Sequence, residues 1–116
     1  MNEIRQGQVF WLDFGPAVGS AAADRHPCVV VQNDIFNRSA IATSVVCLIT
    51  SNLSRAKAPG NVLLMKGEAN LPKASAVNVS QVLTVDKAEL VECTGQLSGA
   101  AADAVRDGLH LLFDRL

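Results

Sequence analysis

The chain has 116 residues, which allows one hydrophobic core, and we expect a single domain over residues 1–116. Hydrophobic residues make up 49% and charged residues 18%, a balance typical of globular rather than disordered chains. No apolar run approaches the roughly 18 residues of a membrane span. The first eight residues are polar and lack the apolar stretch of a signal peptide. We therefore expect a cytoplasmic protein.

The formal net charge is −1, from ten Lys and Arg against eleven Asp and Glu. This balance excludes a general electrostatic attraction to a polyanion such as nucleic acid. One Trp, four Phe and no Tyr offer little aromatic surface on which bases could stack. Any contact with RNA must therefore come from a local patch of the surface.

The three cysteines, Cys28, Cys47 and Cys93, cannot all pair within one chain. None has the Cys-x-x-Cys spacing of a zinc or redox site, so the sequence offers no metal-binding pattern. Cys28 and Cys47 lie inside apolar runs, and Cys93 lies in a mixed one. Because cysteine is among the residues most often buried, we expect free thiols in the interior.

Short apolar runs alternate with turn-rich loops along the chain, which favours a mainly β fold. Residues 27–32 and 41–49 are rich in β-branched side chains and predict buried strands. With residues 81–85 taken as a continuation of the fifth, the expected strands are 8–14, 27–32, 41–49, 61–65, 74–79 and 91–97. The segments 33–39 and 50–60 are expected as loops.

The hydrophobic period changes near the C-terminus. One helical stripe is predicted from apolar residues spaced four, three and four apart: Val105, Leu109, Leu112 and Leu116. Ser98 is expected to be the N-cap of this helix. Five to seven short strands closed by one helix predict a small, strongly curled barrel with the helix packed on it.

Seven short segments, each occurring once, follow one another in a characteristic order over nearly the whole chain. They are GQVFWLD (7–13), PAVGS (16–20) leading to RHPCVVV (25–31), QND and NRS (32–39), LITSNL (48–53), PGNV (59–62), LPK (71–73), and VNV followed by TVDK and Leu90 (77–90). No single segment is specific. Together they resemble the MazF/PemK toxin family from end to end.

The resemblance implies an SH3-like barrel with a C-terminal helix, assembled as a homodimer. It further implies a toxin of a type II toxin–antitoxin system that cuts single-stranded RNA, chiefly mRNA, at a short sequence. Such an endoribonuclease uses no metal or other cofactor, because the 2′-hydroxyl of the RNA is the nucleophile. The expected partners are the RNA and a cognate antitoxin, whose acidic C-terminal tail would occupy the RNA groove.

Cleavage through the 2′-hydroxyl requires a base, an acid and a group that stabilises charge on the phosphate. In the family, much of this is done by a threonine that ends the third strand and an arginine directly before the proline of the second strand. Thr50 matches the threonine, and its hydroxyl is expected to donate to a phosphate oxygen. His26 stands at the arginine position, with Arg25 one residue earlier.

Two arrangements of Arg25 and His26 remain open. Alternation along a strand would point the two side chains to opposite faces, whereas a bend before Pro27 would bring both into the groove. Histidine ordinarily titrates at about pH 6.5, which suits proton transfer, and guanidinium matches the geometry of phosphate. We expect Arg25 and Thr50 to bind the phosphate and His26 to transfer protons.

Four polar residues match positions that line the groove in the family, and they are the expected RNA-binding residues: Ser20, Ser51, Asn52 and Gln81. Besides His26 at the arginine position, two other features depart from the family pattern. Ala21-Ala22 replaces a common Glu-Gln, and Ala74 replaces an acidic residue that is catalytic in some members. These exchanges leave two alternatives open: a barrel that binds but no longer cuts, and a gyrase-targeting toxin on the same fold.

Overall fold

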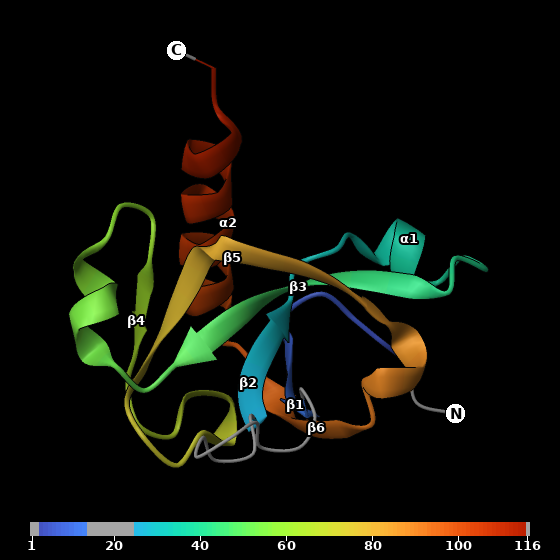
Figure 1. Ribbon diagram of the computed structural model, residues 1–116, viewed down its shortest axis with the longest axis horizontal. Helices are drawn as coiled ribbons and strands as arrows, with labels where there is room; N and C mark the ends of the chain where they lie inside the picture. The colour runs from blue at the N-terminus through green and yellow to red at the C-terminus, as the bar shows by residue number, and fades with distance from the viewer. Residues whose placement is uncertain (1–2, 14–24, 116) are drawn as a thin grey trace, which may run out of the picture.

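The computed structural model describes residues 3–13 and 25–115. In these residues, six strands form one antiparallel sheet with the order β4-β5-β3-β2-β1-β6. The strands are β1 (Gln8–Asp13), β2 (Arg25–Val30), β3 (Thr43–Thr50), β4 (Val62–Leu64), β5 (Ser75–Asp86) and β6 (Glu92–Gln96). The sheet curls into a half-barrel, with the C-terminal helix packed against it (Figure 1). The predicted mainly β barrel with a C-terminal helix is confirmed.

Helical segments connect and close the sheet. They are α1 (Asp34–Asn37), α2 (Gly99–Phe113) and the 3-10 helices η1 (Leu53–Lys57), η2 (Glu68–Asn70) and η3 (Lys87–Glu89). Ser98 caps α2 as predicted, since its hydroxyl accepts a hydrogen bond from the Ala101 N–H at 3.2 Å. No helix in the described part of the chain is both long and apolar enough to cross a membrane.

Single-turn helices interrupt two segments that we expected to be loops. In α1, the Asn33 side chain accepts a hydrogen bond from the Ile35 N–H at 2.8 Å and thereby forms the N-cap. In η1, the Asn52 side chain accepts from the Ser54 N–H at 3.2 Å in the same way. Asparagine favours both turns and helix caps, so the sequence marked these positions without distinguishing the two outcomes.

The sheet has a hydrophobic core on each face. The core under α2 is built from residues such as Val29, Cys47 and Val105, whereas the opposite core contains Phe10 and Cys28. Adjacent residues of β2 therefore belong to different cores, as alternation in a strand requires.

Strand β5 is long enough to serve both cores. The register of its pairing with β3 changes between Cys47 and Leu48 of β3, and β5 bends at the corresponding irregularity. The predicted strands 74–79 and 81–85 are therefore two halves of one strand.

Two expectations about buried side chains were wrong. Leu112 is 41% exposed because the last turns of α2 extend beyond the sheet (Figure 1), so the apolar stripe loses contact with the core after Leu109. Leu116 lies outside the described residues. Cys93 is exposed on β6, at the edge of the sheet, whereas Cys28 and Cys47 are buried as expected.

Candidate functional site

The pairing of β2 with β3 relates two of the predicted catalytic residues. Cys28 pairs with Leu48, and Val30 pairs with Val46. Continued by two residues, this antiparallel register sets His26 opposite Thr50, on the same face of neighbouring strands. The sequence alone predicted neither this pairing nor the shared face.

Arg25 and His26 belong to consecutive register positions. His26 pairs with Leu12 of β1, and Arg25 pairs with Asp13. The two side chains therefore start from opposite faces of the sheet, as alternation predicted. Because they lie at the very beginning of β2, both still reach one pocket at the end of the sheet.

This pocket, which we call the Trp11 pocket, has a volume of about 270 Å³. It contains three of the predicted site residues, Arg25, His26 and Ser51. Its remaining lining residues are Trp11, Pro27, Ile49, Leu71, Pro72, Lys73 and Ser75. The pocket therefore combines two cationic side chains and two hydroxyls with apolar walls.

The Arg25 side chain is held in place by two contacts. Its guanidinium lies over the Trp11 ring, 5.2 Å from the ring centroid, and it forms an ion pair with Glu92. The side chains of Arg25 and Glu92 are 48% and 55% exposed, so solvent screens the pair. Together the contacts orient Arg25 and leave further N–H donors for an anion.

Thr50 ends β3 beside this pocket. Its hydroxyl oxygen accepts a hydrogen bond from the Asn52 N–H at 3.1 Å. This contact uses the oxygen as an acceptor, and the hydroxyl proton is left to donate to a phosphate oxygen. The Asn52 carboxamide oxygen also accepts from the Ser54 hydroxyl at 2.7 Å, so Asn52 has a structural role in capping η1.

Gln81 lies away from the pocket, at the bend of β5. It accepts a hydrogen bond from the Asn78 side-chain amide at 2.9 Å. Asn78 pairs with Leu48 across the sheet and lies on the face that carries Thr50. Gln81 is exposed and is joined to this face through Asn78. Ser20, Ala21 and Ala22 lie outside the described residues.

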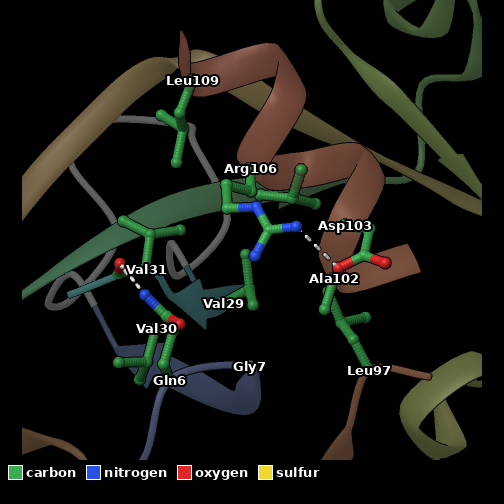
Figure 2. A pocket seen from close by; sticks show the side chains of 11 residues that line it. Gln6, Gly7, Val29, Val30, Val31, Leu97, Ala102, Asp103, Arg106 and Leu109 are labelled. Carbon is green, nitrogen blue, oxygen red and sulfur yellow. Dashed lines mark hydrogen bonds and ion pairs between the residues drawn. The ribbon is translucent and has the colours of Figure 1, made fainter. Parts of the chain in front are cut away.

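A second cavity, of about 190 Å³, lies between α2 and the other end of β2 (Figure 2). Its floor is apolar and includes Val29 and Leu97, while the Arg106–Asp103 hydrogen bond lies at its side. It includes none of the predicted site residues. Among the described residues, no three His, Cys, Asp or Glu side chains are grouped so that they could hold a metal ion.

Sequence analysis missed three members of the site: Trp11, Lys73 and Glu92. Trp11 was assigned only to the first strand, and Lys73 only to the LPK segment. Glu92 is 67 residues away from Arg25 along the chain, so no local pattern could connect them. Only Trp11 could have been singled out from the sequence as a candidate site residue, because the chain has so few aromatic residues.

The curled sheet, with a C-terminal helix packed on it and a cationic pocket at its end, forms a small half-barrel of the SH3-like class. The MazE–MazF complex (Form II) of Deinococcus radiodurans has this fold, with a TM-score of 0.79 at 20% identity over 100% of both chains. So does a mycobacterial endoribonuclease in complex with its cognate antitoxin, with a TM-score of 0.73 at 24% identity over 96% of this chain and 93% of that chain.

The chain belongs to the family of PemK-like, MazF-like toxins of type II toxin–antitoxin systems, whose model matches residues 5–113. Endoribonuclease MazF6 of Mycobacterium tuberculosis is 37% identical over 111 residues, which are 96% of this chain and 97% of the relative. Endoribonuclease EndoA of Bacillus subtilis is 31% identical over 108 residues, which are 93% and 92% of the two chains. The family identified from the seven sequence segments is confirmed.

Proposed function

We propose that this chain is a toxin that cuts single-stranded RNA, chiefly mRNA, at a short sequence and without a metal ion. The proposal is supported by the β2–β3 pairing of Cys28 with Leu48, whose continuation by two residues would set His26 opposite Thr50, next to a pocket that contains Arg25. Family membership supports it, as do the relatives that are named endoribonucleases. Because mRNA is cytoplasmic, the proposal places the toxin there.

In the proposed reaction, the 2′-oxygen attacks the adjacent phosphorus and the bond from phosphorus to the 5′-oxygen breaks. The products are a 2′,3′-cyclic phosphate and a 5′-hydroxyl, so one proton leaves the 2′-oxygen and one reaches the 5′-oxygen. His26 performs one of these transfers, since an imidazole both takes and gives a proton near neutral pH. Thr50 and Arg25 stabilise the phosphate charge by donating hydrogen bonds. DNA has no 2′-hydroxyl and is not cut.

The partners follow from the same surface. A cognate antitoxin would place an acidic C-terminal tail in the RNA path, where Arg25 and Lys73 provide positive charge. A homodimer would cover apolar side chains at the end of α2, where Leu111 and Phe113 are 59% and 71% exposed.

The test is cleavage of a mixed-sequence single-stranded RNA by purified protein in EDTA, with the matched DNA beside it. General acid–base catalysis contributes about 10²–10⁴-fold, so we expect His26→Ala to lower the rate by at least about 100-fold. We expect Thr50→Ala to lower it by about 10²-fold, the loss typical of removing one donor to the transition state. Two matched controls, His110→Ala on the exposed face of α2 and Thr43→Ala at the far end of β3, should cut normally.

The products separate this mechanism from others. We expect RNA-only cutting that survives EDTA and leaves 2′,3′-cyclic phosphate ends. Intact RNA with folded, antitoxin-free protein at high concentration would refute general nuclease activity. That outcome would favour a barrel that binds without cutting, which the missing carboxylate at Ala74 also favours.

A further inference from the structure

Arg25, His26 and Ser51 all line the Trp11 pocket, but most of its other features are not used by the proposed chemistry. Trp11, Pro27 and Pro72 provide flat apolar walls. Lys73 adds a second cation to Arg25. A volume of about 270 Å³ is below the roughly 300–1,000 Å³ of pockets that enclose drug-sized molecules, so it suits a single planar ring system.

The stacked pair of Trp11 and Arg25 is prepared to bind such a ring. Unpaired bases of single-stranded nucleic acid stack on aromatic rings and on the guanidinium planes of arginine. Here the two surfaces already lie together, 5.2 Å apart from guanidinium carbon to ring centroid. Glu92 contacts the guanidinium at Nη2 and thereby helps to keep it over the ring. An ordered stacking surface lowers the entropy cost of binding a base.

Local charge gives the pocket a preference for a nucleotide over an uncharged ring. The residues that line the pocket carry two positive charges, on Arg25 and Lys73, and no carboxylate; Glu92 and Asp13 lie beside Arg25 but outside the lining. The lining is thus positive in a chain whose formal net charge is −1. One phosphodiester matches this excess, whereas a long polyanion finds no wider basic surface.

The pocket is also contiguous with the proposed cleavage position. Arg25 and His26 are consecutive residues of β2, about 3.3 Å apart along the strand. Ser51, which lines the pocket, directly follows Thr50. RNA whose scissile phosphate lies at Thr50 and His26 would therefore place a neighbouring nucleotide at the mouth of the pocket.

We infer that the Trp11 pocket is a subsite for one nucleotide that flanks the scissile phosphate of single-stranded RNA. The base packs against the Trp11–Arg25 stack, and its phosphate pairs with Lys73. The inference rests on the proposed RNA-cutting function for the identity of the ligand. It adds Trp11 and Lys73 as substrate-binding residues and Glu92 as the residue that positions Arg25.

The chain contains a single tryptophan, so intrinsic fluorescence reports on this pocket directly. The probe is a mixed-sequence single-stranded DNA oligonucleotide, which has bases and phosphates but no 2′-hydroxyl and stays uncut. We expect saturable quenching of Trp11 fluorescence. With a labelled oligonucleotide and anisotropy as the readout, Trp11→Leu should weaken binding by about 5- to 100-fold, the usual effect of losing one stacking contact. Trp11→Phe should retain most of the affinity.

Lys73→Met tests the phosphate contact. Each contact of this kind to a single strand contributes about −0.7 to the slope of log K against log salt, so the variant should lose about that much of the slope. Lys66→Met, which removes an exposed lysine outside the pocket, is the matched control and should leave both the slope and the affinity unchanged.

Failure of the subsite and failure of the function have different signatures. Wild-type protein that cuts RNA but binds oligonucleotide as tightly in Trp11→Leu and Lys73→Met would refute the subsite and leave the function intact. Quenching that depends on Lys73, without cutting of any RNA, would retain the subsite and refute the nuclease. Quenching by an acidic peptide but not by either nucleic acid would assign the pocket to a protein tail and overturn the inference.

Discussion

Helix α2 meets the rest of the molecule at a point where two glycines face each other. A Cβ atom placed on Gly108 would lie 2.1 Å from the Gly60 carbonyl oxygen and 3.2 Å from Val79 Cγ1. Gly60 has a φ of +76°, in the left-handed region that glycine adopts at no steric cost. Next to it, Asn61 accepts a hydrogen bond from the Val79 N–H at 2.9 Å and links the turn to β5. Gly108 therefore lets the helix fix the turn before β4.

The change Gly108→Ala should destabilise the protein by about 2 kcal/mol. Carbon atoms attract best at about 3.5–4.0 Å, so the helix and the Gly60 carbonyl would have to separate by roughly 1 Å. Overpacking costs typically about 1–3 kcal/mol, and the upper end applies because the obstacle is backbone and not a flexible side chain. The higher helix propensity of alanine offsets about 1 kcal/mol of this cost. For a chain of this size, the net loss corresponds to a fall of about 8 °C in Tm.

The assay is thermal unfolding followed by circular dichroism, with Gly99→Ala as the matched control in the same helix. A Cβ on Gly99 meets nothing within 4 Å. This variant should therefore melt at or slightly above the wild-type temperature, since alanine stabilises a helix by up to about 1 kcal/mol relative to glycine. If Gly108→Ala melts as high as Gly99→Ala, α2 does not press on Gly60 and the packing argument fails.

Two further predictions concern a lysine and the cysteines. The Lys87 ammonium donates to the carbonyls of Phe36, Asn37 and Ser39 at 3.3, 2.9 and 3.1 Å. Lys87→Met should therefore lower the free energy of unfolding in urea by about 1–3 kcal/mol, while the control Lys66→Met should change it by less than about 0.5 kcal/mol. Equal effects of the two changes would show that these carbonyls do not need the ammonium. A thiol reagent should modify only Cys93 in native protein and all three thiols in denaturant, because Cys28 and Cys47 are buried. Burial raises the pKa of Cys28 to about 12 and that of Cys47 to about 11. The thiolates are thus favoured in the unfolded state, so the contribution of these two thiols to stability should be constant below about pH 9 and fall above it by up to about 1.4 kcal/mol per pH unit for each thiol. A stability that stays flat from pH 9 to pH 10.5 would contradict this burial.

Local patterns predicted the elements of the fold well, because each depends on neighbouring residues. The β-branched runs gave strands close to their observed positions, and Ser98 was identified as a cap from its place before a helical period. The errors arose where the outcome depends on distant parts of the chain. The exposure of Leu112 follows from where the sheet ends, and that of Cys93 from the position of β6 at the sheet edge. No pattern within either segment contains that information.

The site shows the same division between local and long-range information. Alternation predicted that Arg25 and His26 leave the strand on opposite faces, and the β1–β2 register agrees. Alternation could not predict that both side chains reach one pocket, since this depends on β2 starting at the open end of the sheet. The positioning of Arg25 by Glu92 needs the pairing of β6 with β1, which brings together segments far apart in the sequence.

The arrangement at the start of β2 suggests how a nearly neutral chain could act on a polyanion. A strand places consecutive side chains on opposite faces, so Arg25 and His26 can serve different parts of one substrate without competing for space. Both residues line the Trp11 pocket. The β2–β3 register, continued by two residues, sets His26 opposite Thr50, where charge develops in the proposed reaction, while Arg25 lies over the Trp11 ring, where a neighbouring nucleotide would stack. The exchange of arginine for histidine before Pro27 then does not remove the cation from the site. It moves the cation one residue back, to the side of the Trp11 ring, and leaves an imidazole at the original position. Binding and proton transfer should therefore respond separately, with salt affecting the contacts of Arg25 and Lys73 and the change His26→Ala affecting the rate of cleavage.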